Sequence, residues 1–542
     1  MIKRLVLMMA VLILLTLAIG CSQNSEEMTE PNEEIQEITL CESWGFEAGF
    51  PTIFTPGKHP NYQAAYYLAN FYETLVNYHE GKIVPGLAES WAISADGLVY
   101  TFTLKQGIKF SDGADLNAAV VKKNLEMLPN LLGDYKGSTE LISILFKEAR
   151  IIDEYVIAVH LTSPYYGVLQ DFAKPMPLGM MSPHAFNEDG TLSDQLLTYS
   201  MGTGPYMSAG QRVENTYTFV RNPNYGGEKP DLDKFHVKVI PDNEAKALAL
   251  RNGEVDLIFG ASKISYDGFQ EFSKDGRYKA KTSAENVMTR FLGFNAAKEP
   301  FNDKQVRLAV SHAIDKESIS VNLFYGLETK ADNLLSRSLP YCDLELEPYE
   351  YDVEKAKQLL ESAGWLDSDG DGIREKDGQE LAGEILYKSD RAVNHDLALT
   401  IASSLKELGM EIKIIGFDLL AWYTEIQKGN YTIAYARTYG IPFDPYLTIS
   451  NMSSEPLIDN SLAQGFAHVQ DGNNIIKGLT ALVNEQEIQE QYDFILNEVH
   501  ENSSFVPISY IKELVIFDGD KIDDYQFHGQ PSQFDAAGIR LK

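Results

Sequence analysis

The sequence from residue 87 to residue 113 reads LAESWAISADGLVYTFTLKQGIKFSDG. Within it, the apolar residues Tyr100, Phe102 and Leu104 stand two apart and are separated by threonines. A period of two residues predicts a β-strand over 98–105 with one buried face. The Asp112-Gly113 pair that follows is typical of a turn. This stretch therefore predicts β-sheet structure in the first part of the chain.

The period of the apolar residues changes along the chain. Two more strands are predicted at 155–161 and 216–221. After residue 300 the apolar spacing becomes helical. We predict one helix capped by Asn302 and a second that is capped by Asp352 and stopped by Gly364. A third helix over 397–408, followed by Gly409 and a strand over 411–415, completes a pattern typical of an α/β protein.

The N-terminus has the features of a secretory signal. Lys3 and Arg4 precede an apolar run from Leu5 to Ile19, which is shorter than the about 20 residues that cross a bilayer. The run ends Leu-Ala-Ile-Gly-Cys21, which resembles the lipobox of bacterial lipoproteins, although Ala18 stands where that box usually has Leu. We predict a signal peptide at 1–20, a lipid on Cys21 and a flexible tether at 21–37. The alternative is an ordinary signal with a chance cysteine.

Composition narrows the functional classes. The formal net charge of -32 excludes nucleic acid as a partner, because that function needs a basic surface. It does not show that the ligand is cationic, because a solubilising surface accounts for the charge. Cys41 and Cys342 have no Cys-x-x-Cys spacing, so we expect two free or buried thiols, with a disulfide between them as the alternative. The length beyond the tether is too great for one core, so two or more lobes are expected.

Five blocks of sequence together resemble the family-5 extracellular solute-binding proteins of ABC importers. The first block is 87–113. The others are GTGPY (202–206) with RNPNY (221–225), VIP (239–241) through GEVDL (253–257), FNDKQVR (301–307) through AID (313–315), and YD (351–352) through AGW (363–365). They stand in the family's order and at its spacing across about residues 38–520.

The resemblance implies an α/β, two-lobed periplasmic-binding-protein-like fold. This is the type II arrangement in its large form, with an extra subdomain and lobes joined by crossover strands. The first lobe would comprise 38–287 and a C-terminal return at 505–542, and the second lobe 288–504, with crossings near Met288 and Ser504. The implied function is capture of a small solute by hinge closure and its delivery to a permease. We expect a monomer on the extracytoplasmic face of the cell membrane, with no catalytic residue and no cofactor.

Within the family, the likeness is strongest to nickel-binding members. It lies in 239–260, in RTYGIPFDP (437–445) and in VPISYI (506–511). Peptide-binding members usually place an acidic residue four positions before the Pro of the second stretch, and Ile441 stands there in this chain. The sequence therefore favours nickel or a nickel chelate as the transported ligand, with a di- or oligopeptide as the alternative. The arginine that nickel-binding relatives often carry in the segment AKPMPLG (173–179) is absent, and 453–464 contains no histidine.

His59, in the loop PGKHPNY (56–62), is the metal-ligand candidate, with a surface-loop histidine as the alternative. His468 and His528 are weaker candidates. Because one imidazole cannot complete a nickel coordination sphere, we expect the metal to arrive chelated. The carboxylates of a chelator match the fork of a guanidinium. The arginine candidates are Arg290, Arg391 and Arg437, and the candidates for aromatic walls are Trp44, Tyr62, Tyr439, Phe443 and Tyr446.

Two further patterns bear on metals and catalysis. Asp367-x-Asp369-x-Asp371-Gly resembles the start of a calcium loop, but Gly378 stands where such a loop needs its bidentate Glu. A hairpin turn between helix and strand is the alternative. His500-Glu501 lacks the second histidine of a zincin, and the chain has no nucleophile elbow and no phosphate loop. An enzyme is therefore not expected, and a secreted metallohydrolase is the remote alternative.

Overall fold

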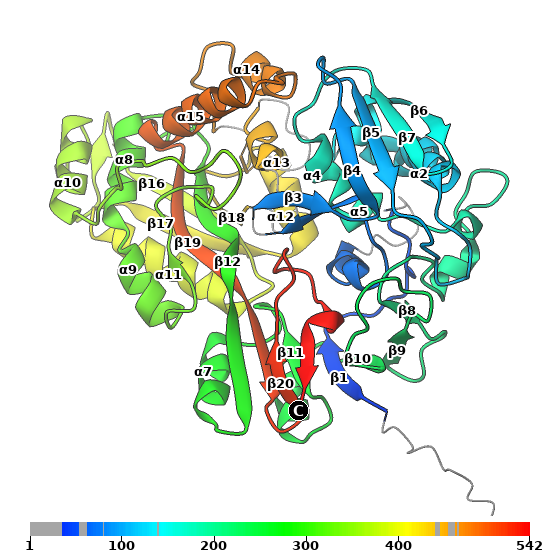
Figure 1. Ribbon diagram of the computed structural model, residues 1–542. Coiled ribbons are helices and arrows are strands. Elements are labelled where there is room, and N and C mark those ends of the chain that lie inside the picture. The colour runs from blue at the N-terminus through cyan, green and yellow to red at the C-terminus, as the bar shows by residue number, and fades with distance from the viewer. Residues whose placement is uncertain are drawn as a thin grey trace, which may run out of the picture. The chain divides into compact units, whose positions relative to one another are not determined.

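The main feature of the fold is an eleven-stranded sheet (Figure 1). The computed structural model describes residues 35–53, 62–79, 81–137, 140–438, 445–453, 461–462 and 465–542. Glu37–Lys542 forms one compact unit. The chain is therefore mixed α/β, as the sequence predicts.

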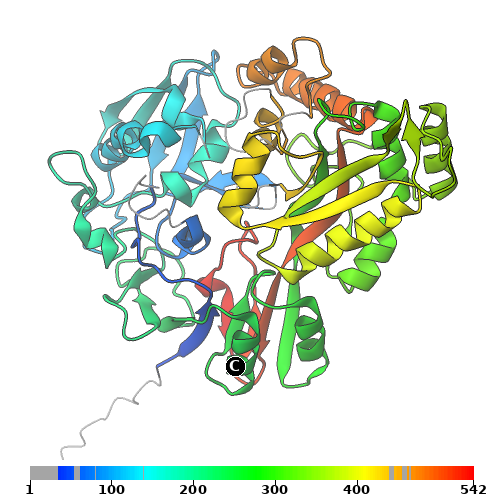
Figure 2. The same cartoon turned by 180° about the vertical axis from the view of Figure 1, so that it is seen from behind.

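Two long antiparallel strands form the centre of this sheet, β12 (Tyr278–Phe294) and β19 (Phe505–Asp518). They run side by side in both views (Figures 1 and 2). Met288 lies within β12, and Ser504 immediately precedes β19. On one side follow β18 (Ile433–Arg437), β16 (Ala382–Lys388) and β17 (Glu411–Phe417). On the other side follow β11 (Leu257–Phe259), β1 (Glu37–Glu42), β10 (Lys234–Val239), β9 (Thr216–Arg221) and β8 (Tyr206–Ser208).

A separate four-stranded sheet lies in the first half of the chain. Its order is β4 (Ala88–Ile93), β5 (Val99–Leu104), β7 (Val156–Leu161) and β6 (Phe146–Asp153). Helix α2 (Ala118–Leu132) packs against it. Tyr100, Phe102 and Leu104 all point into the core, so the alternation of the 98–105 segment predicted both the strand and its buried face.

The remaining elements connect and cover the strands. The longer helices are α6 (Asn243–Arg251), α7 (Tyr266–Lys274), α8 (Lys304–Ala313), α10 (Val353–Ser362), α11 (Ala392–Lys406), α12 (Leu419–Gln427), α14 (Gly472–Leu479) and α15 (Glu485–Glu501). The shorter helices are α3 (Ile142–Leu145), α4 (Val168–Phe172), α5 (Pro175–Leu178), α9 (Lys316–Ser318) and α13 (Tyr446–Ser450). The eleventh strand of the large sheet is β13 (Thr329–Lys330), which pairs with β19. The other short strands are β2 (Val76–His79), β3 (Lys82–Pro85), β14 (Glu375–Lys376), β15 (Gln379–Glu380), β20 (Ile522–Tyr525) and β21 (Ile539–Leu541).

Helix starts were predicted to within a few residues. Asp352 caps α10 as expected, since its carboxylate accepts from the Lys355 N–H at 2.9 Å. For α8 the prediction of Asn302 is wrong, because Asp303 makes the cap through the Gln305 N–H at 2.8 Å. Helix α11 begins at Ala392, ahead of the predicted 397, because its first turn contains polar residues that hide the apolar period.

The buried apolar residues form three clusters. The first contains residues of 38–259 together with 515–539. The second packs around the central strands and draws on α6, α7, α8, α10 and α11. The third packs β18, α12, α13 and α15 together. Cys41 and Cys342 are buried in the second and third clusters and are not joined by a disulfide, which confirms the expectation of two buried thiols.

No helix in the part of the chain that the structure describes is both long enough and apolar enough to cross a membrane.

Candidate functional site

Two arginines meet at one edge of the sheet because of its topology. Strands β16 and β18 are parallel neighbours, so their carboxyl ends lie at the same edge. Arg437 is the last residue of β18, and Arg391 follows β16 as the residue that precedes α11. In open α/β sheets, ligands bind outside the carboxyl ends of the strands. This edge is therefore where a ligand site is expected.

The two guanidinium groups are close enough to affect each other. Burial, and then the charge of Arg437, lower the pKa of Arg391 to about 10. Among the described residues, the one ion-pair partner of Arg391 is Asp390, at 3.9 Å, and Arg437 has no hydrogen-bond or ion-pair partner. Two positive side chains held together with few protein acceptors form a site that attracts anions.

Arg290 lies next to this pair but is committed to the protein. It stands opposite Arg437 in the β12–β18 register. Its guanidinium donates to both carboxylate oxygens of Glu328, with the Nε–Oε1 and Nε–Oε2 distances both 2.9 Å, and to the Tyr435 hydroxyl at 2.6 Å. Arg290 and Glu328 are each 1% exposed. Burial disfavours both charges, but the pair raises the pKa of Arg290 and lowers that of Glu328, so both stay ionised. This ion pair therefore supports the sheet next to the two half-buried arginines.

Tyr66, which packs on the first apolar cluster, lies close to the same two arginines. It ends the 3-10 helix Tyr62–Tyr66. Burial and the charge of Glu513 raise the pKa of its hydroxyl, while the charges of Arg437 and Arg391 oppose the rise. We call the group of Tyr66, Lys263, Arg391, Arg437 and Glu513 the interlobe site, since it joins residues of the first cluster with those of the strands beyond β12.

The floor beside this site combines an ion pair with aromatic rings. The Lys263 ammonium binds the buried carboxylate of Glu42, which also accepts from the Tyr67 hydroxyl at 2.9 Å. The same ammonium lies 5.6 Å from the centroid of the Trp44 ring. Trp44 in turn meets Phe46 edge-on with ring centroids 5.4 Å apart. The predicted wall residue Trp44 thus carries a cation over its face.

Glu513 is a buried carboxyl on the central strand β19. The residue is 7% exposed, and burial raises the pKa of its carboxyl to about 7. Its Oε1 accepts from the backbone N–H of Ala261 and, at 3.3 Å, from that of Leu514. The charges of Lys263 and Arg391 act in the opposite direction to burial. Its ionised form therefore lies near the positive side chains of the interlobe site.

Tyr446 contributes to a cluster of four tyrosines that includes Tyr166, Tyr341 and Tyr492. The Tyr166 and Tyr492 hydroxyl oxygens are 2.6 Å apart. The ring centroid of Tyr166 lies 5.6 Å from that of Tyr341 and 6.5 Å from that of Tyr446. Tyr166 packs on the first apolar cluster and on the third, whereas the other three belong to the third. This tyrosine cluster therefore bridges the two sides of the molecule.

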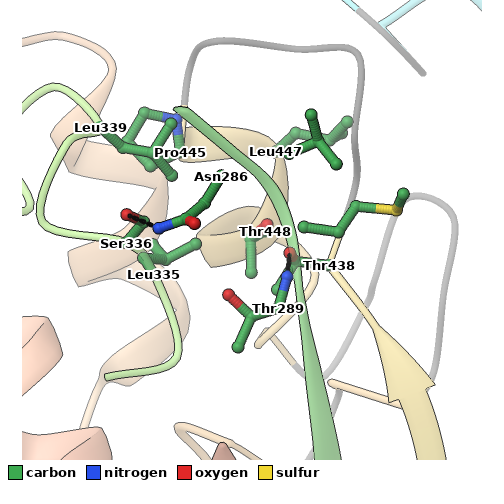
Figure 3. A pocket seen from close by; sticks show the side chains of 11 residues that line it. Asn286, Thr289, Leu335, Ser336, Leu339, Thr438, Pro445, Leu447 and Thr448 are labelled. Carbon is green, nitrogen blue, oxygen red and sulfur yellow. Dashed lines mark hydrogen bonds between the residues drawn. The ribbon is translucent and has the colours of Figure 1, made fainter. Parts of the chain in front are cut away.

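A small cavity borders β12 in the crossover region (Figure 3). In the close-up, the Asn286 side chain faces Ser336, to whose hydroxyl it donates at 3.2 Å, and the Thr289 N–H donates to the Thr438 hydroxyl at 2.8 Å. The cavity measures about 30 Å³. A space of that size holds about one water molecule. It is therefore too small to be the solute site.

Comparisons with known proteins identify the family. The model of the bacterial extracellular solute-binding proteins, family 5, matches residues 82–458. The chain belongs to this family. The nickel-binding periplasmic protein of Escherichia coli (strain K12) is 32% identical over 484 residues, which are 89% of this chain and 90% of that protein. The glutathione-binding protein GsiB of Salmonella typhi is 30% identical over 354 residues, 64% of each chain.

A solved structure agrees with this assignment. The crystal structure of NikA from Brucella suis in complex with Fe(III)-EDTA superimposes with a TM-score of 0.84 at 29% identity, and the match covers 93% of this chain and all of that one. The two-lobed periplasmic-binding fold predicted from the sequence is thereby confirmed. The chain is a solute-binding protein, and its role in an ABC importer is to bind the substrate.

Several candidates of this family-5 protein lie outside the described residues: Cys21, His59, Tyr439, Phe443 and the side chain of Tyr62. The two weaker histidine candidates are described, and each has a protein partner. His468 lies 3.6 Å from Glu498, and His528 accepts from the Gln530 N–H at 3.0 Å. Of the predicted ligand residues, the structure brings Arg391 and Arg437 together, with Arg290 beneath them.

The aspartate-rich stretch forms an exposed turn that leads into the β14–β15 hairpin. Carboxylate oxygens of Asp367, Asp369, Asp371 and Glu375 lie within 4.8 Å of one another. Backbone N–H groups already donate to all four, including Gly370 to Asp367 at 2.8 Å and Ser368 to Glu375 at 3.0 Å. The hairpin expected as the alternative to a calcium loop is present.

Four residues of the site and of the ion pair beside it were not predicted from the sequence: Glu42, Tyr66, Lys263 and Glu513. Two of them had a detectable signal. Glu42 ends a buried strand, and Glu513 is an acidic residue within the apolar run of β19. A charge at such positions must have a partner or a function, because burying it alone is costly. Tyr66 and Lys263 lie on a 3-10 helix and a loop and carried no such signal.

Proposed function

We propose that this family-5 protein captures nickel as a chelate complex and delivers it to the permease of an ABC importer. The solute is held at the interlobe site by Arg391 and Arg437, which bind carboxylates of the chelator, and it leaves chemically unchanged. Ligand-driven closure follows from a higher affinity of the closed state for the complex.

The arginine pair is the observation that carries this proposal. A bare nickel cation would be repelled by two neighbouring guanidinium groups, whereas the outward carboxylates of a metal chelate are attracted to them. Among the described residues Arg437 has no hydrogen-bond or ion-pair partner, which supports its proposed role in binding such a ligand. Arg391 has one distant carboxylate, at 3.9 Å.

The relatives support the same cargo. The Escherichia coli relative is named for nickel binding, and the Brucella suis NikA structure contains iron held by EDTA, a chelator rich in carboxylates. Both match the chain over about nine-tenths of its length. A metal held by a chelator with carboxylates agrees with the ligands that these relatives are named for. It also agrees with the positive charge of the two arginines.

Thermal unfolding with nickel and histidine, singly and together, tests the proposal. A ligand at a hundred times its dissociation constant adds about 2.7 kcal/mol of stability, which is readily measured as a rise in melting temperature. We expect the rise with the two together, and its loss in Arg437→Gln. Arg212→Gln is the matched control, because Arg212 is an exposed arginine that pairs with Glu47 at 3.0 Å. No rise with nickel and any chelator, citrate and EDTA included, would refute the proposal.

A short peptide is the second candidate cargo, and one relative favours it. Glutathione is a tripeptide, and GsiB of Salmonella typhi is named for binding it. Against it stands Ile441, at the position where peptide-binding members carry an acidic residue. Native mass spectrometry with elemental analysis of the purified protein separates the two cargoes, since it detects bound metal and bound peptide together.

We also propose that a lipid on Cys21 anchors the chain to the extracytoplasmic face of the cell membrane, with 21–37 as the tether. Cys21→Ser should move the protein from the membrane fraction to the medium. The lobes are proposed to comprise 38–287 with 505–542, and 288–504, in a monomer. Limited proteolysis and light scattering test the boundaries and the oligomeric state.

A further inference from the structure

Glu513 occupies an irregular point of the central strand pair. In the β12–β19 register, Thr282 pairs with Leu514 and Asn286 with Lys512. The β12 residues 283–285 therefore bulge opposite Glu513 alone, and the Glu513 N–H donates to the Ser283 hydroxyl at 2.9 Å. Bulges of this kind redirect a side chain and are common beside binding sites.

The carboxylate is held firmly through one oxygen only. Oε1 accepts from the backbone N–H groups of Ala261 and Leu514. Oε2 has no hydrogen-bond donor among the residues that the structure describes, and Glu513 forms no ion pair with any described cation. The residue is nevertheless more than nine-tenths buried. An anion fixed in place with one oxygen unused is a preorganised acceptor.

The surroundings place this acceptor at the interlobe site. Glu513 acts electrostatically on the Tyr66 hydroxyl, and the charges of Arg391 and Lys263 act on Glu513. Lys263 is already bound to Glu42. One carboxylate oxygen without a donor among the described residues thus lies near Arg391, which in turn neighbours Arg437. Together they suit a ligand that presents carboxylates and N–H donors at once.

We propose that Glu513 Oε2 accepts a hydrogen bond from an amine N–H of the metal's chelator, so that the site selects amino-acid chelates over chelators with carboxylates alone. This inference rests on the proposed nickel-chelate function and names its substrate class. A nickel-bound amine keeps its N–H groups and is a strong donor. Citrate has no nitrogen and leaves Oε2 unpaired, and its own carboxylates would repel Glu513.

Calorimetric titrations of wild type and Glu513→Gln, each with nickel–histidine and with nickel–citrate, test this. We expect the variant to lose about tenfold or more in affinity for nickel–histidine, the effect of one hydrogen bond to a charged group, and little for nickel–citrate. Asp256→Asn is the control, because Asp256, immediately before β11, is also a buried carboxylate but is bound by Lys521 at 2.6 Å. It should change neither affinity.

Two outcomes separate the inference from the proposed function. Equal losses for the two complexes, or no loss, would overturn the role of Glu513 and leave nickel-chelate capture intact. Failure of the wild type to bind nickel with any chelator would remove both. A crystal structure of the wild type with nickel and histidine decides the matter if the variant does not fold: Oε2 must lie within about 3.2 Å of a chelator nitrogen.

Discussion

We expect the tyrosine cluster to stabilise the closed state of the two lobes by a measurable amount. One hydrogen bond of this cluster joins the two sides, between the hydroxyls of Tyr166 and Tyr492, 2.6 Å apart. Tyr166 comes from the proposed first lobe and Tyr492 from the proposed second. Opening the lobes would break this bond without unfolding either of them. The substitution Tyr166→Phe removes the hydroxyl and keeps the ring, so it should weaken closure alone.

The size of the effect follows from the contacts. A hydrogen bond between neutral groups contributes about 1 kcal/mol net, or about a fivefold shift in the ratio of closed to open molecules. Tyr166→Ala also removes edge-on contacts with Tyr341, Tyr446 and Tyr492. At about 0.5–1 kcal/mol for each ring pair, the total becomes about 3 kcal/mol, or about a hundredfold. Ligand affinity falls by these factors because the ligand binds the closed state.

Stopped-flow kinetics and calorimetry with the bound solute provide the assay. The loss of affinity should appear mainly as faster dissociation of the ligand, because the hydrogen bond between Tyr166 and Tyr492 forms after the ligand has entered. Tyr349→Phe is the matched control: its hydroxyl donates to the His500 carbonyl at 2.7 Å, and both residues belong to 288–504. That variant should lower the melting temperature without changing affinity. If Tyr166→Phe and Tyr349→Phe have the same effect on the dissociation rate, the tyrosine cluster does not stabilise the closed state.

Three further predictions concern stability. Glu328→Gln leaves Arg290 buried without its counter-charge and should cost about 3–5 kcal/mol in urea unfolding, whereas Glu47→Gln at the exposed Arg212 pair should change it little. Asp352→Ala removes the cap of α10 and should cost about 1 kcal/mol by the same measurement. Burial raises the pKa of Glu513 from 4.5 to about 7, which corresponds to about 3 kcal/mol. The wild type has this stability in full below pH 4.5, where the carboxyl is protonated, and loses it as the pH rises through about 7. Without ligand, Glu513→Gln should therefore be more stable than the wild type above pH 7 and equally stable near pH 4.5. The titratable groups that face this carboxyl are Lys263, Arg391 and Tyr66.

Local sequence signals predicted much of the fold. The strand at 98–105, the strand at 216–221 and the cap at Asp352 depend on neighbours in sequence, and all three are present. The eleven-stranded sheet is different, because β1 pairs with β10 and β11, and β12 pairs with β19, across long stretches of chain. No local period encodes such pairs. The family resemblance supplied that part of the prediction.

The residues of the site also fall into those that the sequence predicted and those that depend on long-range strand pairing. Arg391 was predicted from residue type alone, and Arg437 also from its place at the start of the segment 437–445, which resembles a cleft-lining loop of the family. The parallel pairing of β16 and β18 puts them at the same edge of the sheet. Glu513 stands out as an acidic residue in an apolar run, but its place at the site was missed because it depends on the bulge that three residues of β12 form opposite it. A bulge depends on how two distant strands align, and neither strand shows it alone.

The electrostatics of the site connect ligand choice to closure. Arg391 and Arg437 repel each other, and burial makes the ionised carboxyl of Glu513 costly even though its Oε1 accepts from two backbone N–H groups. In the empty site both the positive and the negative charges are therefore unfavourable. A ligand with carboxylates and amine N–H groups relieves both. Tyr66 packs on the first apolar cluster and the arginines lie on or after strands beyond β12, so a ligand that contacts all three would hold the two sides together. At the proposed site, these charges would therefore favour the closed state in the presence of the ligand.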